Sequence, residues 1–192
     1  MMLRRLTAIA ALSLSACLAS AQVNPLSLLG RAVSTAMDAR SAAEVAADAE
    51  ISAGASKRLL EDKTAEWAGV TVLVFQQHVV LTGAVKTDAV RKRVEQVVRE
   101  SKGVRSVRNE ILVGDLGSLV RDTALEAEIN ATLTATSGVS SVNMRWSVTG
   151  GQAVLMGVAR SREEAGLALS KVRGIKGVKK ATSWLRIVPA KK

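Results

Sequence analysis

The residue with the clearest chemistry in this chain of 192 residues is its only cysteine, which closes the tetrapeptide Leu14-Ser15-Ala16-Cys17. Two arginines and then an apolar run precede the tetrapeptide. This is the layout of a bacterial export signal that ends in a lipobox, in which the cysteine is lipid-modified and becomes the mature N-terminus. The pattern therefore predicts a signal peptide over residues 1–16, with its lipobox at 14–17, and a lipid anchor at Cys17.

A second cleavage signal lies just beyond the first. Ala19-Ser20-Ala21 fits the small-x-small rule of the ordinary signal peptidase, which would release a soluble periplasmic chain that begins at Gln22. The apolar run is shorter than the roughly 20 residues that span a bilayer. Residue 18 is Leu rather than Asp. By resemblance to the sorting rule of enteric bacteria, that residue favours the periplasmic face of the outer membrane for the lipidated form.

Other residue types that carry chemistry are sparse in this sequence. His78 is the only histidine, so neither a Ser-His-Asp triad nor a histidine-based metal site can be assembled. The acidic residues are scattered at helical spacings typical of solvated faces, and no glycine-rich phosphate loop is present. We therefore expect no catalysis, no bound metal and no cofactor.

Charge is distributed unevenly along the chain, whose formal net charge is +10. Residues 44–114 hold 11 Lys or Arg against 10 Asp or Glu, whereas residues 117–192 hold 12 against 5. A basic half favours an acidic partner. For an exported protein, anionic phospholipid and acidic envelope components are nearer at hand than nucleic acid, so we expect no nucleic-acid partner. The alternative is a solvated basic surface that serves solubility.

The sequence contains an internal repeat. Residues 81–113 match residues 155–187 without a gap at an offset of 74, with Leu-x-Gly and Lys-Gly-Val shared. Further upstream, residues 49–53 resemble residues 127–131 at an offset of 78, which predicts four extra residues in the first unit near 61–67. A tandem repeat of this length predicts two small domains of one kind, at 44–114 and 117–192.

Each unit has the same predicted elements, and the fold class is α+β. The order is αββαβ, with a three-stranded sheet packed against two helices. Thr87 and Ser161 are good N-caps for the second helix of each unit, and Gly103 and Gly177 are predicted to close it. The predicted first helices are 43–60 and 119–134, and the predicted hairpin strands are 70–75 with 78–85 and 142–149 with 152–158.

The segment from residue 17 to residue 43 stands apart from the repeat. Asn24 and Pro25 open an Ala- and Ser-rich stretch with an N-cap residue followed by proline at the first helical position. We interpret the segment as either a tether or an N-terminal helix.

The αββαβ order, the Leu-x-Gly strand end and the Gly-Val after the second helix resemble the BON domain. With its export signal and paired units, the chain is similar to dual-BON envelope proteins, which include outer-membrane lipoproteins of the division- and lipid-associated type and soluble, osmotically inducible periplasmic proteins. The resemblance covers about residues 44–188. It implies a non-enzymatic protein that binds phospholipid and supports envelope integrity, with envelope proteins as further partners.

The resemblance also implies where lipid would bind. In such proteins the first helix of the second domain meets the bilayer, which assigns Arg121 and Leu125 to that contact. Apart from the resemblance, basic residues on or beside the second helix of this unit offer another possible surface. Near an anionic bilayer each adds about 1 kcal/mol. These predicted contacts are Arg160, Arg162, Lys171, Lys176, Lys179 and Lys180.

A second predicted surface follows from strand alternation in the second unit. Trp184 and Arg186 lie opposite Leu185 and Ile187 on their strand, and Val154 and Met156 join them on the same sheet face. The matching positions of the first unit are polar, at His78, Thr82, Arg108 and Glu110. An exposed apolar face indicates a contact. It is either the packing of one domain on the other or the docking of a membrane or protein partner.

Overall fold

The computed structural model describes residues 38–62, 67–114 and 119–188. The predicted lipid anchor at Cys17, both cleavage sites, and the tether or helix as far as residue 37 lie outside these ranges.

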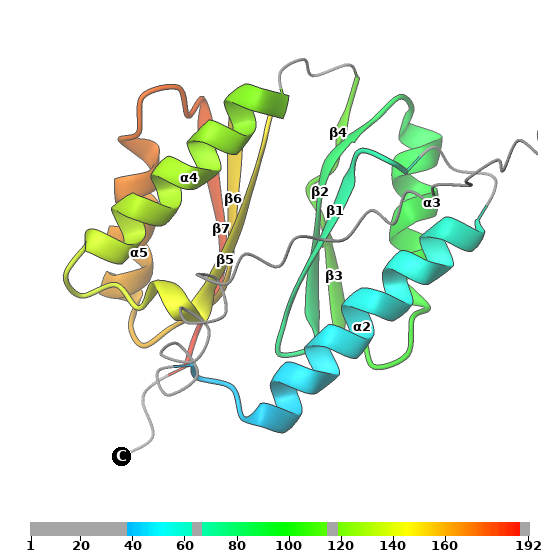
Figure 1. Ribbon diagram of the computed structural model, residues 1–192, viewed down its shortest axis with the longest axis horizontal. Helices are drawn as coiled ribbons and strands as arrows, with labels where there is room; N and C mark the ends of the chain where they lie inside the picture. The colour runs from blue at the N-terminus through cyan, green and yellow to red at the C-terminus, as the bar shows by residue number, and fades with distance from the viewer. Residues whose placement is uncertain (1–37, 63–66, 115–118, 189–192) are drawn as a thin grey trace, which may run out of the picture.

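Two domains of the predicted order make up the described chain, so the α+β assignment with αββαβ twice is confirmed (Figure 1). The first domain contains α2 (Ala42–Glu61), β1 (Val70–Phe75), β2 (His78–Val85), α3 (Asp88–Arg99), β3 (Ser106–Asn109) and β4 (Leu112–Val113). The second contains α4 (Leu119–Ala135), a 3-10 turn η1 (Ser141–Asn143), β5 (Met144–Thr149), β6 (Gln152–Ala159), α5 (Arg162–Arg173) and β7 (Lys180–Ile187).

The two sheets have the same topology but differ in their third strand. In each sheet the hairpin is antiparallel and the third strand pairs in parallel with its second member. In the first domain the third strand is split into β3 and β4, where the side chain of Asn109 accepts a hydrogen bond from the Ile111 amide at 3.1 Å. In the second domain β7 runs unbroken for 8 residues.

Each domain builds its core between the inner face of its helices and one face of its sheet. Ile51, Ala55 and Leu59 recur every four residues along α2 and are at most 4% exposed. The corresponding residues of α4 are Leu125, Ile129 and Leu133, which are at most 5% exposed. Spacing of four keeps these side chains on one helix face, which packs on the alternate, inward-facing residues of the strands.

These core residues correct the predicted four-residue insertion. Ile51 and Leu125 occupy equivalent places, each against the glycine that follows the second helix. The first helices end at Glu61 and Ala135, so a single offset of 74 relates the two domains throughout. An offset of 78 differs from it by one helical turn, which preserves the apolar face and explains the misleading match. Residues 63–66 of the proposed insertion lie outside the described ranges.

A tight hairpin turn in each domain is held by an aspartate from the first helix. Gln76 and Gln77 have φ of 49° and 64°, and Gly150 and Gly151 have φ of 58° and 80°. Positive φ at both central residues is the type I′ geometry that matches strand twist. The Asp48 carboxylate accepts the amides of Gln76 and Gln77 at 2.8 and 2.7 Å. Asp122 accepts those of Gly150 and Gly151 at 2.7 and 3.0 Å.

The second helices begin as predicted and end earlier than predicted. The Thr87 hydroxyl accepts the Val90 amide at 3.3 Å, and the Ser161 hydroxyl accepts the Glu164 amide at 3.2 Å, so both N-caps are confirmed. The helices end at Arg99 and Arg173 rather than at the glycines. Gly103 and Gly177 take positive φ, 85° and 102°, in the turn that leads to the third strand.

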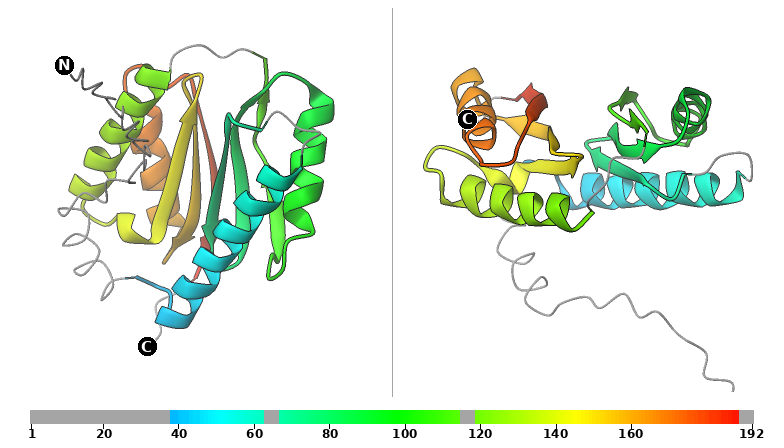
Figure 2. Two further views of the ribbon diagram at one scale, coloured as in Figure 1. Left: turned by 45° about the vertical axis from the view of Figure 1, so that its right-hand side comes forward. Right: turned by 90° about the horizontal axis from the view of Figure 1, so that it is seen from above.

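The two sheets face each other in the centre of the molecule, and the helices lie on the outside (Figure 1). Helices α2 and α4 run in opposite directions on the two flanks. The Trp184 indole contacts the Glu110 carboxylate, and these two residues are equivalent at the offset of 74. An approximate twofold axis through the interface therefore relates the two domains, and one domain is inverted relative to the other (Figure 2).

Candidate functional site

An apolar cluster joins the facing sheets. Its buried members are Phe75 and Val80 of the first domain and Val154, Met156 and Val158 of the second, all at most 6% exposed. They occupy the strand faces turned away from the helices, because their neighbours at odd spacing fill the domain cores. Leu73 and Trp184 pack at the margin of the cluster.

Hydrogen bonds from both domains surround this cluster. Trp184 Nε1 donates to Glu110 Oε1 at 2.8 Å, and the guanidinium of Arg108 lies 4.7 Å from the centre of the indole ring. Arg186 donates to the side-chain oxygen of Gln76. All four residues of the predicted apolar face, Val154, Met156, Trp184 and Arg186, thus contact the first domain in the structure.

The first-domain side of this contact was predicted to be polar, which holds at its margin, where Arg108 and Glu110 contact Trp184, but not in its buried part. Val80 is the equivalent of Val154 at the offset of 74, and Phe75 comes from the neighbouring strand. Thr82, named as a polar position, is only 1% exposed, and no hydrogen-bond partner of its hydroxyl is found among the described residues. Alternation along residues 78–85 would have found Val80. Phe75 carries no such signal, because its strand has apolar residues on both faces and so lacks an alternation of apolar and polar residues near it.

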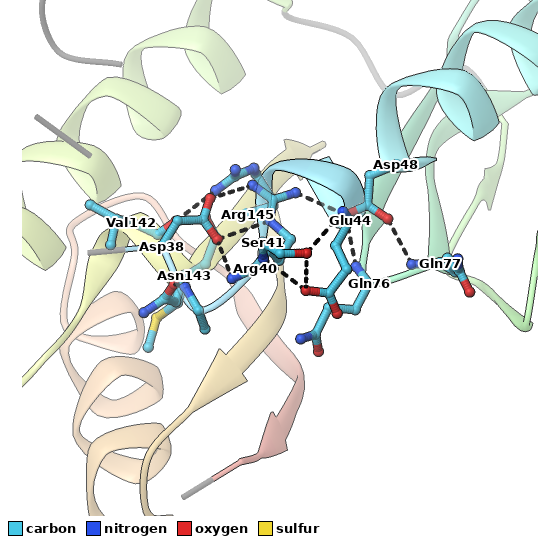
Figure 3. A network of polar contacts seen from close by, with 12 residues as sticks. Asp38, Arg40, Ser41, Glu44, Asp48, Gln76, Gln77, Val142, Asn143 and Arg145 are labelled. Atoms are coloured by element: carbon cyan, nitrogen blue, oxygen red, sulfur yellow. Dashed lines mark hydrogen bonds and ion pairs between the residues drawn. The ribbon is translucent and has the colours of Figure 1, made fainter. Parts of the chain in front are cut away.

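A short strap before α2 links both domains to the hairpin turn of the first (Figure 3). The Arg40 guanidinium pairs with Asp48 at 2.8 Å and with Asp38 at 2.7 Å, and lies 4.3 Å from the centre of the Phe75 ring. The Ala39 amide donates to the Asn143 side chain of the second domain at 2.6 Å. Burial raises the pKa of Asp38, but hydrogen bonds and charge from Arg40 outweigh it, and its pKa lies below the ordinary value.

Two of the predicted basic contacts meet at one end of the second domain. Arg121 and Lys179 line a cleft of about 400 Å³ together with the hairpin turn that Asp122 holds. Val120, immediately before Arg121 at the start of α4, is 81% exposed. Lys176 and Lys180 are exposed, and each is next in sequence to a residue that lines this cleft. The cleft, with these neighbouring residues, is called the α4 cleft below.

The remaining predicted contacts lie elsewhere on the second domain. Arg160 pairs with Glu164 at 3.2 Å, and Arg162 begins α5. With a rise of about 1.5 Å per residue, the 12 residues of α5 separate these arginines by about 18 Å from the end that leads to Lys176. Lys171 faces the C-terminal end of α4. The basic residues therefore do not form the single surface that the sequence suggested.

Leu125 is a correction to the predicted membrane contact. Its side chain is 5% exposed and belongs to the core of the second domain, packed against the position of Gly177. Spacing in the helix explains the error, since the exposed apolar residue of this turn is Val120. Glu126, an acidic neighbour on α4, accepts the Val148 amide at 2.8 Å, and its carboxylate is thereby committed to the sheet.

The equivalent end of the first domain has a different composition. Ala46 and Ala47 stand where the second domain has Val120 and Arg121, and Arg105 stands where it has Lys179. The groove along α2 contains Glu50 and Glu61 as well as basic residues. At this end the first domain exposes Val45 at only 37%, against 81% for Val120, and its most exposed apolar residue, Leu60 at 65%, lies at the other end of α2.

The described residues contain neither a metal-binding cluster nor a membrane-spanning helix. Within those ranges, no group of three metal-binding side chains comes together, and no helix has the length and apolar content to cross a membrane. His78 contacts the Ser106 hydroxyl at 2.7 Å.

Comparison with known sequences places both domains in one family. Residues 47–115 and 121–189 each match the BON domain family, at the same offset of 74 that the structure shows. The chain is 33% identical over 129 residues to an uncharacterised protein of Anaplasma centrale encoded in the gshII 5′ region, a match that covers 65% of this chain and 85% of that protein. It is 27% identical over 144 residues to osmotically-inducible protein Y of Escherichia coli, covering 72% of each.

Solved structures resemble the chain only weakly. Two chains of CdsD, a structural protein of the type III secretion system of Chlamydia trachomatis, are each 15% identical, with TM-scores of 0.33 and 0.32. The matches cover 72% and 70% of this chain and 63% and 64% of those chains, so this chain spans less than two thirds of their length.

Proposed function

The chain belongs to the BON domain family and carries two copies of the domain, and from this membership we propose that it is a non-enzymatic binding protein of the bacterial envelope. Its second domain docks on anionic phospholipid through the α4 cleft, and Cys17 anchors the chain to the periplasmic face of the outer membrane. In this way the protein supports envelope integrity. The similarity to a relative named osmotically-inducible supports a role under osmotic stress.

The observation that carries the lipid proposal is that an exposed apolar residue, Val120, stands next to the basic residues of the α4 cleft. An apolar side chain that is 81% exposed can enter the headgroup region of a bilayer. Arg121 and Lys179 line the same cleft and can pair with lipid phosphates there. The N-terminal end of α4 carries a partial positive charge, which favours the same ligand.

An anchor at Cys17 makes such a weak surface effective. Each buried methylene of an acyl chain contributes about 0.8 kcal/mol, so two or more chains hold the protein at the membrane. Contacts of about 1 kcal/mol per basic residue then act at a high effective concentration. The same cleft on an untethered domain would bind weakly and reversibly.

Vesicle co-sedimentation tests the lipid proposal. Residues 18–192 should bind phosphatidylglycerol vesicles but not phosphatidylcholine vesicles, and salt should weaken the binding. Reversal of both charges in Arg121→Glu/Lys179→Glu should reduce the affinity at least about tenfold. Lys57→Glu/Lys102→Glu makes the same charge change on exposed residues of the first domain and should leave binding intact. An equal loss of vesicle binding in both double variants would show that binding depends only on net charge, and it would refute a specific role for the cleft.

The alternative is a soluble periplasmic protein that acts in osmotic stress as a binding or chaperone-like module after cleavage behind Ala21. The mass of the native protein separates the two. A diacylglycerol-modified N-terminus at Cys17 supports the anchored form, and a mature chain that starts at Gln22 supports the soluble one.

A further inference from the structure

A second cleft lies between the third strands of the two domains. It has a volume of about 400 Å³ and is lined by β2 and β3 on one side and by β6 and β7 on the other. Val80 and Met156, from the apolar interface, contribute to its lining. Arg108, Trp184, Arg186 and His78 line it as well. We call it the β3–β7 cleft; it shares no residue with the α4 cleft.

Positive charge dominates this cleft. Arg108 and Arg186 line it, and Arg105 is close enough to act on the titration of both His78 and Arg186. The acidic groups nearby are committed: Glu110 accepts the Trp184 indole N–H, and Asp48 accepts Arg40 and two turn amides. Burial lowers the pKa of His78, and the charges of Arg186 and Arg105 lower it further against a smaller opposite effect from Asp48. An anion is the complementary ligand.

One wall of the cleft is an open sheet edge. β7 is the last strand of its sheet, and within the described residues no further strand pairs with it. The Val188 amide donates inward to Ala159 O at 2.9 Å, so alternation turns the backbone groups of Ser183, Leu185 and Ile187 outward. Of these groups, the Leu185 amide makes a long hydrogen bond of 3.4 Å to the Ser183 hydroxyl. In the first domain the matching edge is interrupted between β3 and β4. The unbroken strand is the one suited to pairing with another chain.

We propose that the β3–β7 cleft binds an extended acidic segment of a partner protein, which adds to β7 as a strand and places its carboxylates beside Arg108 and Arg186. The open edge supplies main-chain hydrogen bonds, and the charged cleft selects among sequences. A recessed site between two sheets suits a single extended chain better than a planar bilayer. This site is separate from the lipid proposal and does not depend on it.

Fluorescence anisotropy with a defined peptide tests the proposal. The probe is a fluorescein-labelled decapeptide of alternating Thr and Glu, and the control peptide has Gln in place of Glu. Residues 18–192 should bind the Glu peptide at least tenfold more tightly. Methylation of every peptide nitrogen, which leaves the charge unchanged, should abolish binding because it removes the amide donors on both edges of the peptide. Equal binding of the methylated peptide would refute strand addition.

Variants and a spectroscopic signal locate the binding. Arg108→Glu should weaken binding of the Glu peptide at least tenfold. Because Arg108 also contacts Trp184, Arg105→Glu serves as a second variant and should weaken binding of the Glu peptide as well. Lys102→Glu is the matched control, on an exposed residue outside the cleft. Because His78 is the only histidine, its imidazole NMR signals are unique, and the peptide should shift them and raise the pKa of His78. No binding, or binding that leaves these signals unmoved, would overturn the proposal.

Discussion

Single carboxylates organise the backbone in both domains. Asp48 and Asp122 each accept two hairpin-turn amides, and Glu164 accepts the amides of Ser140 and Arg160 at 2.7 and 2.8 Å. Burial raises the pKa of Glu164, but these amides and the side chain of Arg160 outweigh burial and hold the pKa below its ordinary value. The ionised form therefore stabilises the fold.

Glu164→Gln should destabilise the second domain by about 1–3 kcal/mol at neutral pH, because charged hydrogen-bond acceptors are lost from a buried site. The folded pKa lies below the ordinary 4.5, so this contribution is complete above about pH 4.5 and disappears as the pH falls through the folded value. Urea denaturation at neutral pH and at about pH 3 should show a difference from the unsubstituted chain that shrinks in acid. A constant difference would contradict the charge assignment.

The glutamines of the first hairpin turn predict a stabilising substitution. Gln77 has φ of 64°, where a side chain is strained and glycine is not. Gln77→Gly should raise the free energy of unfolding by about 0.5–1 kcal/mol, since its carbonyl bond to Arg105 is unaffected. Gly151→Gln, the reverse change in the second domain, should destabilise, because its Cβ would lie 3.1 Å from the Gly177 oxygen. Thermal denaturation of the pair checks both signs.

Residue-scale features were predictable from the sequence only where the contact is local. The N-caps Thr87 and Ser161 act within three residues, and both were confirmed. Arg40 was not identified, because its partner Asp48 depends on a helical turn and its contact with Phe75 on tertiary packing. Leu125 was assigned to the bilayer by resemblance to the family, whereas its spacing of four from Ile129 and Leu133 places it in the core.

At the scale of elements, the facing sheets join two domains that could each close a core alone. The interface consists of residues on the strand faces opposite the helices, and Val154 is one of its buried members at 6% exposure. Neighbours of Val154 on the strand, Ala153 and Leu155, belong to the core of the second domain. Interface and core therefore occupy opposite faces of one strand.

Val154→Asp should separate the domains without unfolding the second one, because a carboxylate would be buried in an apolar contact while Ala153 and Leu155 still face the helices. Calorimetry should then resolve two transitions in place of one, and small-angle scattering should show a larger radius of gyration. Thr71→Asp introduces the same charge on an exposed residue of β1 and should change neither. A single transition in the Val154 variant would show that this contact does not couple the unfolding of the two domains.

The first hairpin was predicted best, whereas in the second hairpin residues 142 and 143 belong to η1 and the second strand extends to Ala159. Residues 70–75 and 78–85 were predicted to the residue, because β-branched runs and a two-residue turn define a hairpin. The repeat offset in the first helix was wrong by four residues, since a shift of one turn keeps the apolar face. The split of the third strand into β3 and β4 depends on the Asn109 side chain, for which the sequence gives no local signal.

At the scale of the whole molecule, we propose separate tasks for separate parts of the protein. The strap through Arg40 lies at the domain interface. We propose that the α4 cleft binds lipid and that the β3–β7 cleft binds an extended partner. Because the domains are inverted relative to each other, equivalent ends point in opposite directions (Figure 2). We therefore propose that only the second domain presents the start of its first helix to the membrane.

The most direct test uses the fact that Cys17 is the only cysteine. In residues 18–192, Val120→Cys can be labelled with an environment-sensitive fluorophore, and Ala46→Cys labels the equivalent exposed position of the first domain. Phosphatidylglycerol vesicles should shift the emission of the label at position 120 to the blue and leave the label at position 46 unchanged. Equal shifts at both positions, or none at position 120, would contradict lipid docking through the α4 cleft.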